Sequence, residues 1–72
     1  MTENMNLKIG EAAGLVYYRL KEGECSLNQI KTHLGTNGID SHLALMAIGW
    51  LAREDKITLN KESNRWSVRL NE

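Results

Sequence analysis

Apolar residues near the start of the chain recur at the spacing of one helix face. This stripe comprises Ile9, Ala12, Ala13, Val16 and Leu20. It predicts a helix over about residues 8–22, capped by Asn6 and ended by Gly23. Gly10 and Gly14 lie off the stripe, and a glycine inside a helix costs about 1 kcal/mol relative to alanine. We therefore expect another backbone to approach closely at these two positions.

Two further helical stretches follow, joined by a short turn. Ser26 and Gln29 have the spacing of a capping box and open a helix of about eight residues. Its predicted buried edge comprises Leu27, Ile30 and Leu34. A tight turn over residues 35–38 precedes Asp40, which is placed to cap a third helix ending near Glu54. Two helices joined by a short glycine-containing turn predict a helix-turn-helix motif.

After the third helix the apolar period changes from 3.6 to 2, which indicates strands. In residues 56–60 the inward positions are Ile57 and Leu59, and in residues 65–70 they are Trp66, Val68 and Leu70. Residues 61–64 form a turn-rich connection, so the pattern predicts a β-hairpin, with a short strand at residues 24–25 pairing against it. The predicted fold class is α+β: a winged helix-turn-helix, with three helices followed by a C-terminal β-hairpin wing.

Two segments of the chain are also similar to a known family. Residues 9–20, IGEAAGLVYYRL, and residues 47–57, AIGWLAREDKI, resemble a family of small bacterial winged helix-turn-helix proteins of unknown function. The resemblance covers nearly the whole chain after Lys8, and residues 49–54 are its most specific part. This chain departs from the family pattern at Asp55, where a glycine is common, and the difference affects the geometry of that turn. The resemblance implies the fold and the formation of dimers, and it supplies no catalytic or ligand-binding residues.

Length and composition restrict the class of protein. The 72 residues predict one small domain over residues 8–72, preceded by a flexible tail over residues 1–7. The single Cys25 excludes an internal disulfide and fits a reducing compartment. The N-terminus lacks the apolar segment of a signal peptide, and the longest uncharged run, residues 41–52, is too short to cross a bilayer. These features predict a cytoplasmic protein that does not enter membranes.

The third helix presents few groups that contact DNA bases. In DNA-binding winged helices the second helix of the motif enters the major groove, where Arg, Lys, Asn and Gln contact base edges. The face of the third helix directed away from the core comprises His42, Leu45, Met46, Gly49 and Arg53. Only His42 and Arg53 carry hydrogen-bonding side chains, and they lie at opposite ends. The pattern predicts a poor base-reading surface.

Positive charge is concentrated in the predicted hairpin, although nine basic and nine acidic residues cancel over the whole chain. Alternation places Lys56, Arg65 and Arg69 on one strand face, with Lys61 and Glu62 near the turn. This face is either a surface that contacts phosphates or the solvated side of an amphipathic hairpin. The candidate contacts to double-stranded DNA are Lys31, Ser41, His42, Arg53, Lys56, Arg65 and Arg69.

Several apolar residues lie off the inward stripes of the first and third helices. Exposed together, they would form a patch larger than soluble monomers usually carry. We therefore expect a homodimer with an interface comprising Leu15, Tyr18, Leu43, Leu45, Met46 and Trp50. In the alternative, the wing and the first helix cover Trp50 and Leu43 within one chain.

No cluster of residues predicts catalysis or metal binding. Asp40, Ser41 and His42 are adjacent and point in different directions, and capping is the simpler role for Asp40. Cys25, His33 and His42 lack the spacing of metal ligands. The sequence thus predicts neither an enzyme nor a cofactor. Two functions stay open: a regulator-type protein that binds nucleic acid as a homodimer, and a protein-interaction module whose third helix is buried against a partner.

Overall fold

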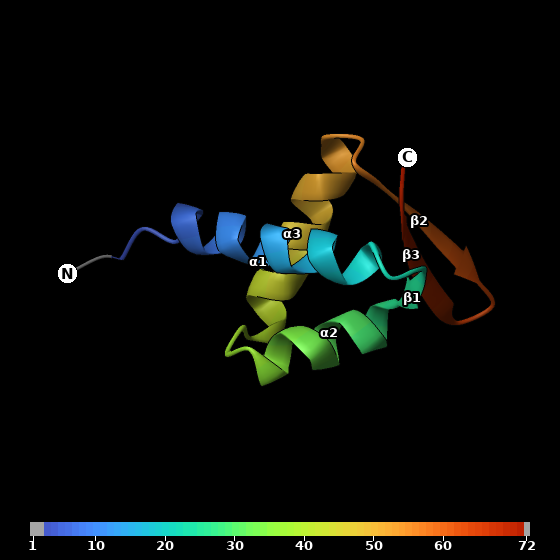
Figure 1. The fold of residues 1–72 in the computed structure, drawn as a ribbon, viewed down its shortest axis with the longest axis horizontal. Helices are drawn as coiled ribbons and strands as arrows, with labels where there is room; N and C mark the ends of the chain where they lie inside the picture. The colour runs from blue at the N-terminus through green and yellow to red at the C-terminus, as the bar shows by residue number, and fades with distance from the viewer. Residues whose placement is uncertain (1–2, 72) are drawn as a thin grey trace.

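Residues 3–71 are described by a computed structural model, in which three helices precede a β-hairpin (Figure 1). In chain order the elements are α1 (Asn6–Leu20), β1 (Cys25–Ser26), α2 (Leu27–Thr36), α3 (Ser41–Arg53), β2 (Ile57–Glu62) and β3 (Arg65–Leu70). The three strands form an antiparallel sheet in the order β1-β3-β2. The predicted fold class is therefore confirmed, and β1 lies one residue later than expected.

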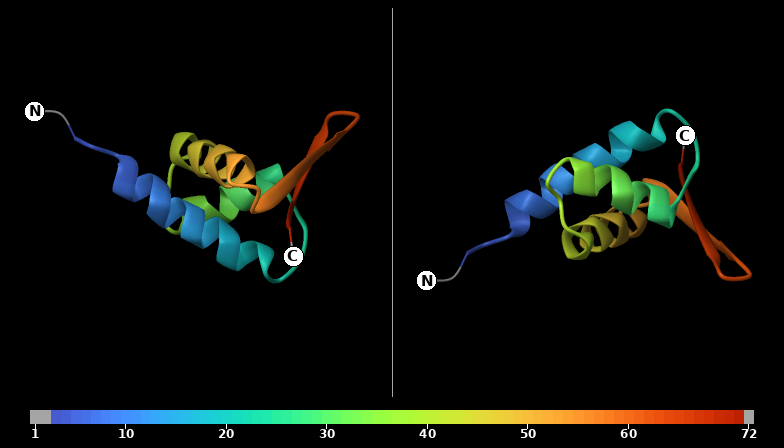
Figure 2. Two further views of the ribbon diagram at one scale, coloured as in Figure 1. Left: turned by 90° about the horizontal axis from the view of Figure 1, so that it is seen from above. Right: turned by 90° about the horizontal axis from the view of Figure 1, so that it is seen from below.

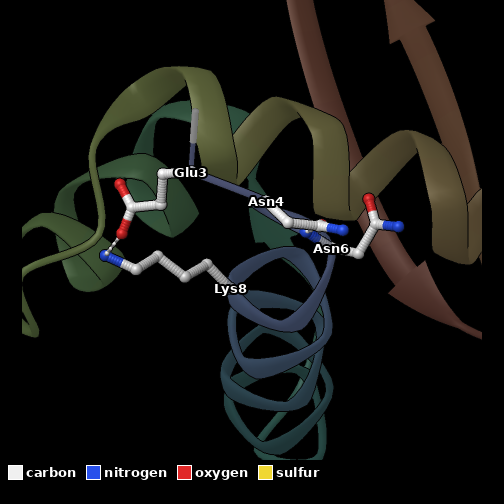
Figure 3. Close-up of polar contacts among 4 residues, drawn as sticks. All are labelled: Glu3, Asn4, Asn6 and Lys8. Carbon is white, nitrogen blue, oxygen red and sulfur yellow. Dashed lines mark hydrogen bonds and ion pairs between the residues drawn. The ribbon is translucent and has the colours of Figure 1, made fainter. Parts of the chain in front are cut away.

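Helix α1 begins two residues earlier than predicted, and Asn6 is not its cap. Asn6 is the first helical residue, and its backbone N–H donates to Oδ1 of Asn4 at 2.9 Å. Figure 3 shows this segment together with the ion pair between Lys8 Nζ and Glu3 Oε2, at 3.6 Å. The prediction of Asn6 as cap is wrong because Asn4, which has the same side chain, supplies the acceptor.

Helices α2 and α3 are capped by the residues that the sequence indicated. Ser26 Oγ accepts from the Gln29 N–H at 3.1 Å, and Gln29 Oε1 accepts from the Ser26 N–H at 2.8 Å, which completes the capping box. Asp40 Oδ1 accepts from the Leu43 N–H at 3.0 Å. Helix α2 extends to Thr36, so the turn begins later than predicted, and Gly38 adopts a positive φ of 81° there.

The hairpin is longer than predicted because its turn is shorter. Strand β2 continues through Glu62, which pairs with Arg65, and the turn consists of Ser63 and Asn64 alone. Strand β1 pairs along the other edge of β3 at only two positions, Ser67 and Val68. The hairpin tip therefore extends beyond the three-stranded part of the sheet and projects from the helices (Figure 2). We call β2, the turn and β3 the wing.

The core lies where the three helices meet the base of the wing. The largest fully buried side chains are Val16, Ile30, Leu34 and Val68, from α1, α2 and β3. The other buried core residues are Ala12, Ala13, Leu20, Cys25, Ala44, Ala47, Ile48, Leu51 and Ile57. The inward stripes predicted for the first two helices are thereby confirmed, apart from partial exposure of Ile9 and Leu27.

The two glycines of α1 do not mark a close approach by another backbone of this chain. A Cβ added at Gly10 or Gly14 would meet no atom of the described structure within 4 Å. Gly10 is exposed and Gly14 is half-buried. The expected contact at these positions is therefore wrong for the single chain.

Candidate functional site

Helix α3 is apolar on its exposed side as well as on its buried side. We call the exposed side the α3 face; it comprises Ser41, His42, Leu45, Met46, Gly49, Trp50 and Arg53. Leu45, Met46 and Trp50 are 45%, 53% and 50% exposed. The groups able to contact base edges, on His42 and Arg53, lie at the two ends, as predicted. The middle of the face offers one hydrogen-bonding group, the indole N–H of Trp50.

Four of the six residues predicted for a dimer interface are exposed. They are Tyr18, Leu45, Met46 and Trp50. Leu15 is partly buried against the core, and Leu43 is only 8% exposed. Placing Leu43 on an open surface is therefore wrong. One flank of α3 is therefore covered near Leu43 and open near Trp50.

Trp50 stands between two shallow hollows at the junction of α1 and α3. One hollow is lined by Gly10, Ala13, Gly14, Tyr17, Trp50, Leu51, Lys56 and Asn71. The other is lined by Asn6, Ile9, Gly10 and Trp50. Both are largely open to solvent, so this region is a surface on which another molecule can lie rather than an enclosed ligand pocket.

The wing has an inner and an outer face, fixed by its register. Directly paired residues of an antiparallel ladder lie on the same side of the sheet. The inner face carries the pairs Ile57–Leu70, Leu59–Val68 and Lys61–Trp66, and the outer face carries Thr58–Arg69, Asn60–Ser67 and Glu62–Arg65. Arg65 and Arg69 thus share the outer face, as predicted, while Glu62 lies directly opposite Arg65.

Lys56 does not belong to this face. It precedes β2 and lines the hollow beside Trp50, together with residues of α1. Its backbone carbonyl accepts from the Asn71 N–H at 3.0 Å, which closes the base of the wing. Lys56 thus lies outside the paired strands, whereas Arg65 and Arg69 lie within β3.

The remaining predicted contacts are dispersed. Lys31 is partly buried on α2, and Arg53 is exposed at the end of α3. Ser41 and His42 are exposed at the start of α3, where His42 Nδ1 lies 3.9 Å from Oδ1 of the capping Asp40. The structure therefore brings together two of the seven predicted nucleic-acid contacts, Arg65 and Arg69.

Trp66 is an exposed aromatic residue that the alternation pattern assigned to the interior. It lies on the inner face as predicted, yet it is 42% exposed. The Nζ atom of Lys61 lies 5.4 Å from the centre of its ring, within the range of a cation–π interaction. Sequence reasoning missed this pair because it placed Lys61 in the turn.

Residues 3–71 do not form a recognisable metal site. This part of the chain contains no group of three His, Cys, Asp or Glu side chains placed to hold a metal ion. The buried Cys25 thiol donates to the Gly23 carbonyl, with sulfur and oxygen 3.6 Å apart. Within the same range no helix is long and apolar enough to cross a membrane.

Three helices followed by a hairpin, with α2 and α3 forming the motif, define a winged helix-turn-helix protein. The chain belongs to the family described as Winged helix-turn-helix domain (DUF2582), whose profile matches residues 1–70. It is similar to the uncharacterized protein MJ1608 of Methanocaldococcus jannaschii, with 50% identity over 68 residues, which cover 94% of this chain and 97% of that protein. This confirms the resemblance to a winged-helix family of unknown function. Because this relative is archaeal, it does not support a restriction to bacteria.

Proposed function

We propose that this winged helix-turn-helix protein is a binding module, not an enzyme, that contacts nucleic acid through its wing. The supporting observation is the uneven distribution of surface chemistry. The wing carries Lys61, Arg65 and Arg69 against a single acid, Glu62, whereas the centre of the α3 face is apolar. Because Lys and Arg provide most of the affinity for phosphates, the wing is the better candidate surface.

The predicted binding mode is weak and nearly independent of sequence. Arg65 and Arg69 are exposed on the outer face and belong to one strand, so they can follow a phosphate backbone. Contacts to phosphates position a protein on its target but carry no sequence information. With two or three phosphates neutralised, the logarithm of the affinity would fall with that of salt concentration with a slope of roughly −2 to −3.

The test is an amide chemical-shift titration with a random duplex at low salt. We expect shifts over residues 56–69 and at Ser41 and His42 that fade as salt is added. Replacing both arginines, Arg65→Gln and Arg69→Gln, should abolish the shifts on the wing. The matched control is Lys8→Gln, which removes an exposed cation from α1 and should leave wing binding intact.

Two results would contradict this mode. A base-specific footprint that survives high salt would show direct reading of base edges, which the proposal denies. Silence at low salt, where attraction to phosphates is strongest, would show that the wing does not bind double-stranded DNA.

A second candidate function is favoured by the exposed apolar residues of α3. Leu45, Met46 and Trp50 are about half exposed on one helix, and Tyr18 is exposed on α1. Aromatic residues and Met are enriched in the centres of protein interfaces. We infer that the α3 face associates with a second copy of the chain, with Met46 and Trp50 near the centre.

Sedimentation measurements distinguish this association from a monomer. A dimer at micromolar concentration should dissociate on Met46→Lys, which places a charge on the apolar surface. Thr32→Lys, on the exposed side of α2, adds the same charge elsewhere and should leave the dimer intact. A wild-type protein that stays monomeric at high micromolar concentration would exclude the homodimer.

A further inference from the structure

The tip of the wing carries a partly exposed indole that the core does not require. Trp66 lies two residues before Val68, which is completely buried on the same face. The exposure changes along the strand because β1 pairs only with Ser67 and Val68, while the tip extends past it. Trp66 therefore lies on the part of the inner face that extends beyond the pairing with β1.

Cationic and amide groups surround this indole. Lys61 approaches it from the β2 side, with its Nζ atom 5.4 Å from the ring centre. On the side of β1 and α2 lies a hollow lined by Trp66 itself together with Ser26, Leu27, Asn28, Asn64 and Arg65. The hollow thus presents a hydroxyl, two amides and a guanidinium beside the ring, and none of its lining residues within the described chain is acidic.

The acids near the tip lie around a different hollow. Glu24 and Glu62 line a neighbouring depression, which shares Ser26 and Arg65 with the hollow beside Trp66. Glu62 pairs with Arg65 on the outer face, whereas Trp66 and Lys61 belong to the inner face. Neither acid lines the hollow that contains the indole, and the surroundings of Trp66 suit an anionic ligand with a flat apolar part.

We propose that Trp66 stacks on an unpaired base, so that the preferred ligand of the wing is single-stranded nucleic acid. The inference rests on the proposed function and names its substrate class. In a duplex both faces of each internal base are stacked, whereas a single strand offers a free face to an aromatic side chain. Lys61 and Arg65 are placed to neutralise the adjoining phosphates, and Asn28 and Asn64 to hydrogen-bond with the base. Because every base has a flat face, sequence preference would be modest.

Intrinsic fluorescence tests the stacking directly. The chain has two tryptophans and two tyrosines, so Trp50→Phe leaves Trp66 as the single tryptophan, whose emission is excited selectively over that of the tyrosines. We expect a short oligothymidine at low salt to quench this emission. In the full chain, Trp66→Ala should weaken binding of the oligothymidine by about tenfold to a hundredfold. It should change binding of a duplex of equal length by less than about twofold, since phosphate contacts dominate there.

Conservative variants separate stacking from a structural role of the ring. Trp66→Phe keeps an aromatic face and should retain most of the affinity for the single strand. Lys61→Met removes the cation above the ring but leaves the indole, so the quenching should persist with a shallower salt dependence. Far-ultraviolet circular dichroism of each variant shows whether the hairpin and helices remain folded.

The outcomes distinguish this inference from the proposed function. If Trp66→Ala weakens binding of the single strand but not of the duplex, the stacking is supported. If Trp66→Ala leaves the binding of both ligands unchanged, or weakens both equally, the stacking is overturned and nucleic-acid binding remains in place. Binding of neither ligand by the wild-type protein overturns the proposed function, and the stacking with it.

Discussion

Truncating two leucines of α3 separates its buried side from its exposed side. Leu43 is 8% exposed and Leu45 is 45% exposed, and they are two positions apart in one helix. Replacing a buried leucine by alanine costs about 2–5 kcal/mol. At Leu45 about half of the side chain is already hydrated, so the loss should be about 1 kcal/mol or less. The gain in helix propensity from alanine is the same in both variants and cancels in the comparison.

Urea unfolding followed by circular dichroism measures this difference. For 72 residues the total stability is expected to be about 4–11 kcal/mol, so Leu43→Ala removes a large fraction of it. If the α3 face forms a dimer, Leu45→Ala should also reduce the dependence of stability on protein concentration, whereas Leu43→Ala should lower stability at every concentration. Equal losses for the two variants at the lowest concentration would refute the assignment of the two sides of α3.

Three further substitutions test local features by thermal denaturation. Asp40→Ala should cost about 0.5–2 kcal/mol because it removes the acceptor for the Leu43 N–H, and Asp40→Asn should retain most of that stability. Asp55→Gly should raise stability by up to about 1 kcal/mol, because Asp55 has a φ of 62°. The substitution keeps the bond from Asn71 Nδ2 to the Asp55 carbonyl and loses only the exposed 3.3 Å bond from the same atom to Asp55 Oδ1. Gly14→Ala should stabilise α1 by about 0.4–1 kcal/mol, since a Cβ there meets no described atom within 4 Å. A lower melting temperature for either of these last two variants, or an unchanged one for Asp40→Ala, would contradict the corresponding argument.

Features set by residues close in the sequence could be predicted from it. The capping box of α2 depends on Ser26 and Gln29, three residues apart, and the cap of α3 depends on Asp40 alone. The buried stripes follow from the helical period, and the hairpin follows from strict alternation. Each of these patterns covers at most about four turns of one helix or two neighbouring strands. Predicting them therefore needs little knowledge of how distant elements pack.

Features set by the crossing of elements could not be predicted in this way. Leu43 and Trp50 lie on the same flank of α3, two turns apart, yet one is covered and the other is half exposed. Helical spacing directs both side chains to the same side of α3. It does not show which neighbouring element covers either of them. Lys56 was misplaced for a related reason: its position beside Trp50 depends on where β2 begins.

The two partly exposed tryptophans lie on two separate surfaces, for each of which we propose a different partner. Trp50 adjoins Met46 on the α3 face and borders hollows whose α1 side includes glycine and alanine, which suits the apolar surface of another protein chain. Trp66 lies between Lys61 and the hollow that contains Arg65, which suits an anionic ligand with aromatic rings. Because the wing projects from the helices, a partner on the α3 face need not cover the wing tip (Figure 2). The two functions are therefore compatible, and substitutions at Trp50 should affect association without the loss of nucleic-acid binding expected from Trp66→Ala.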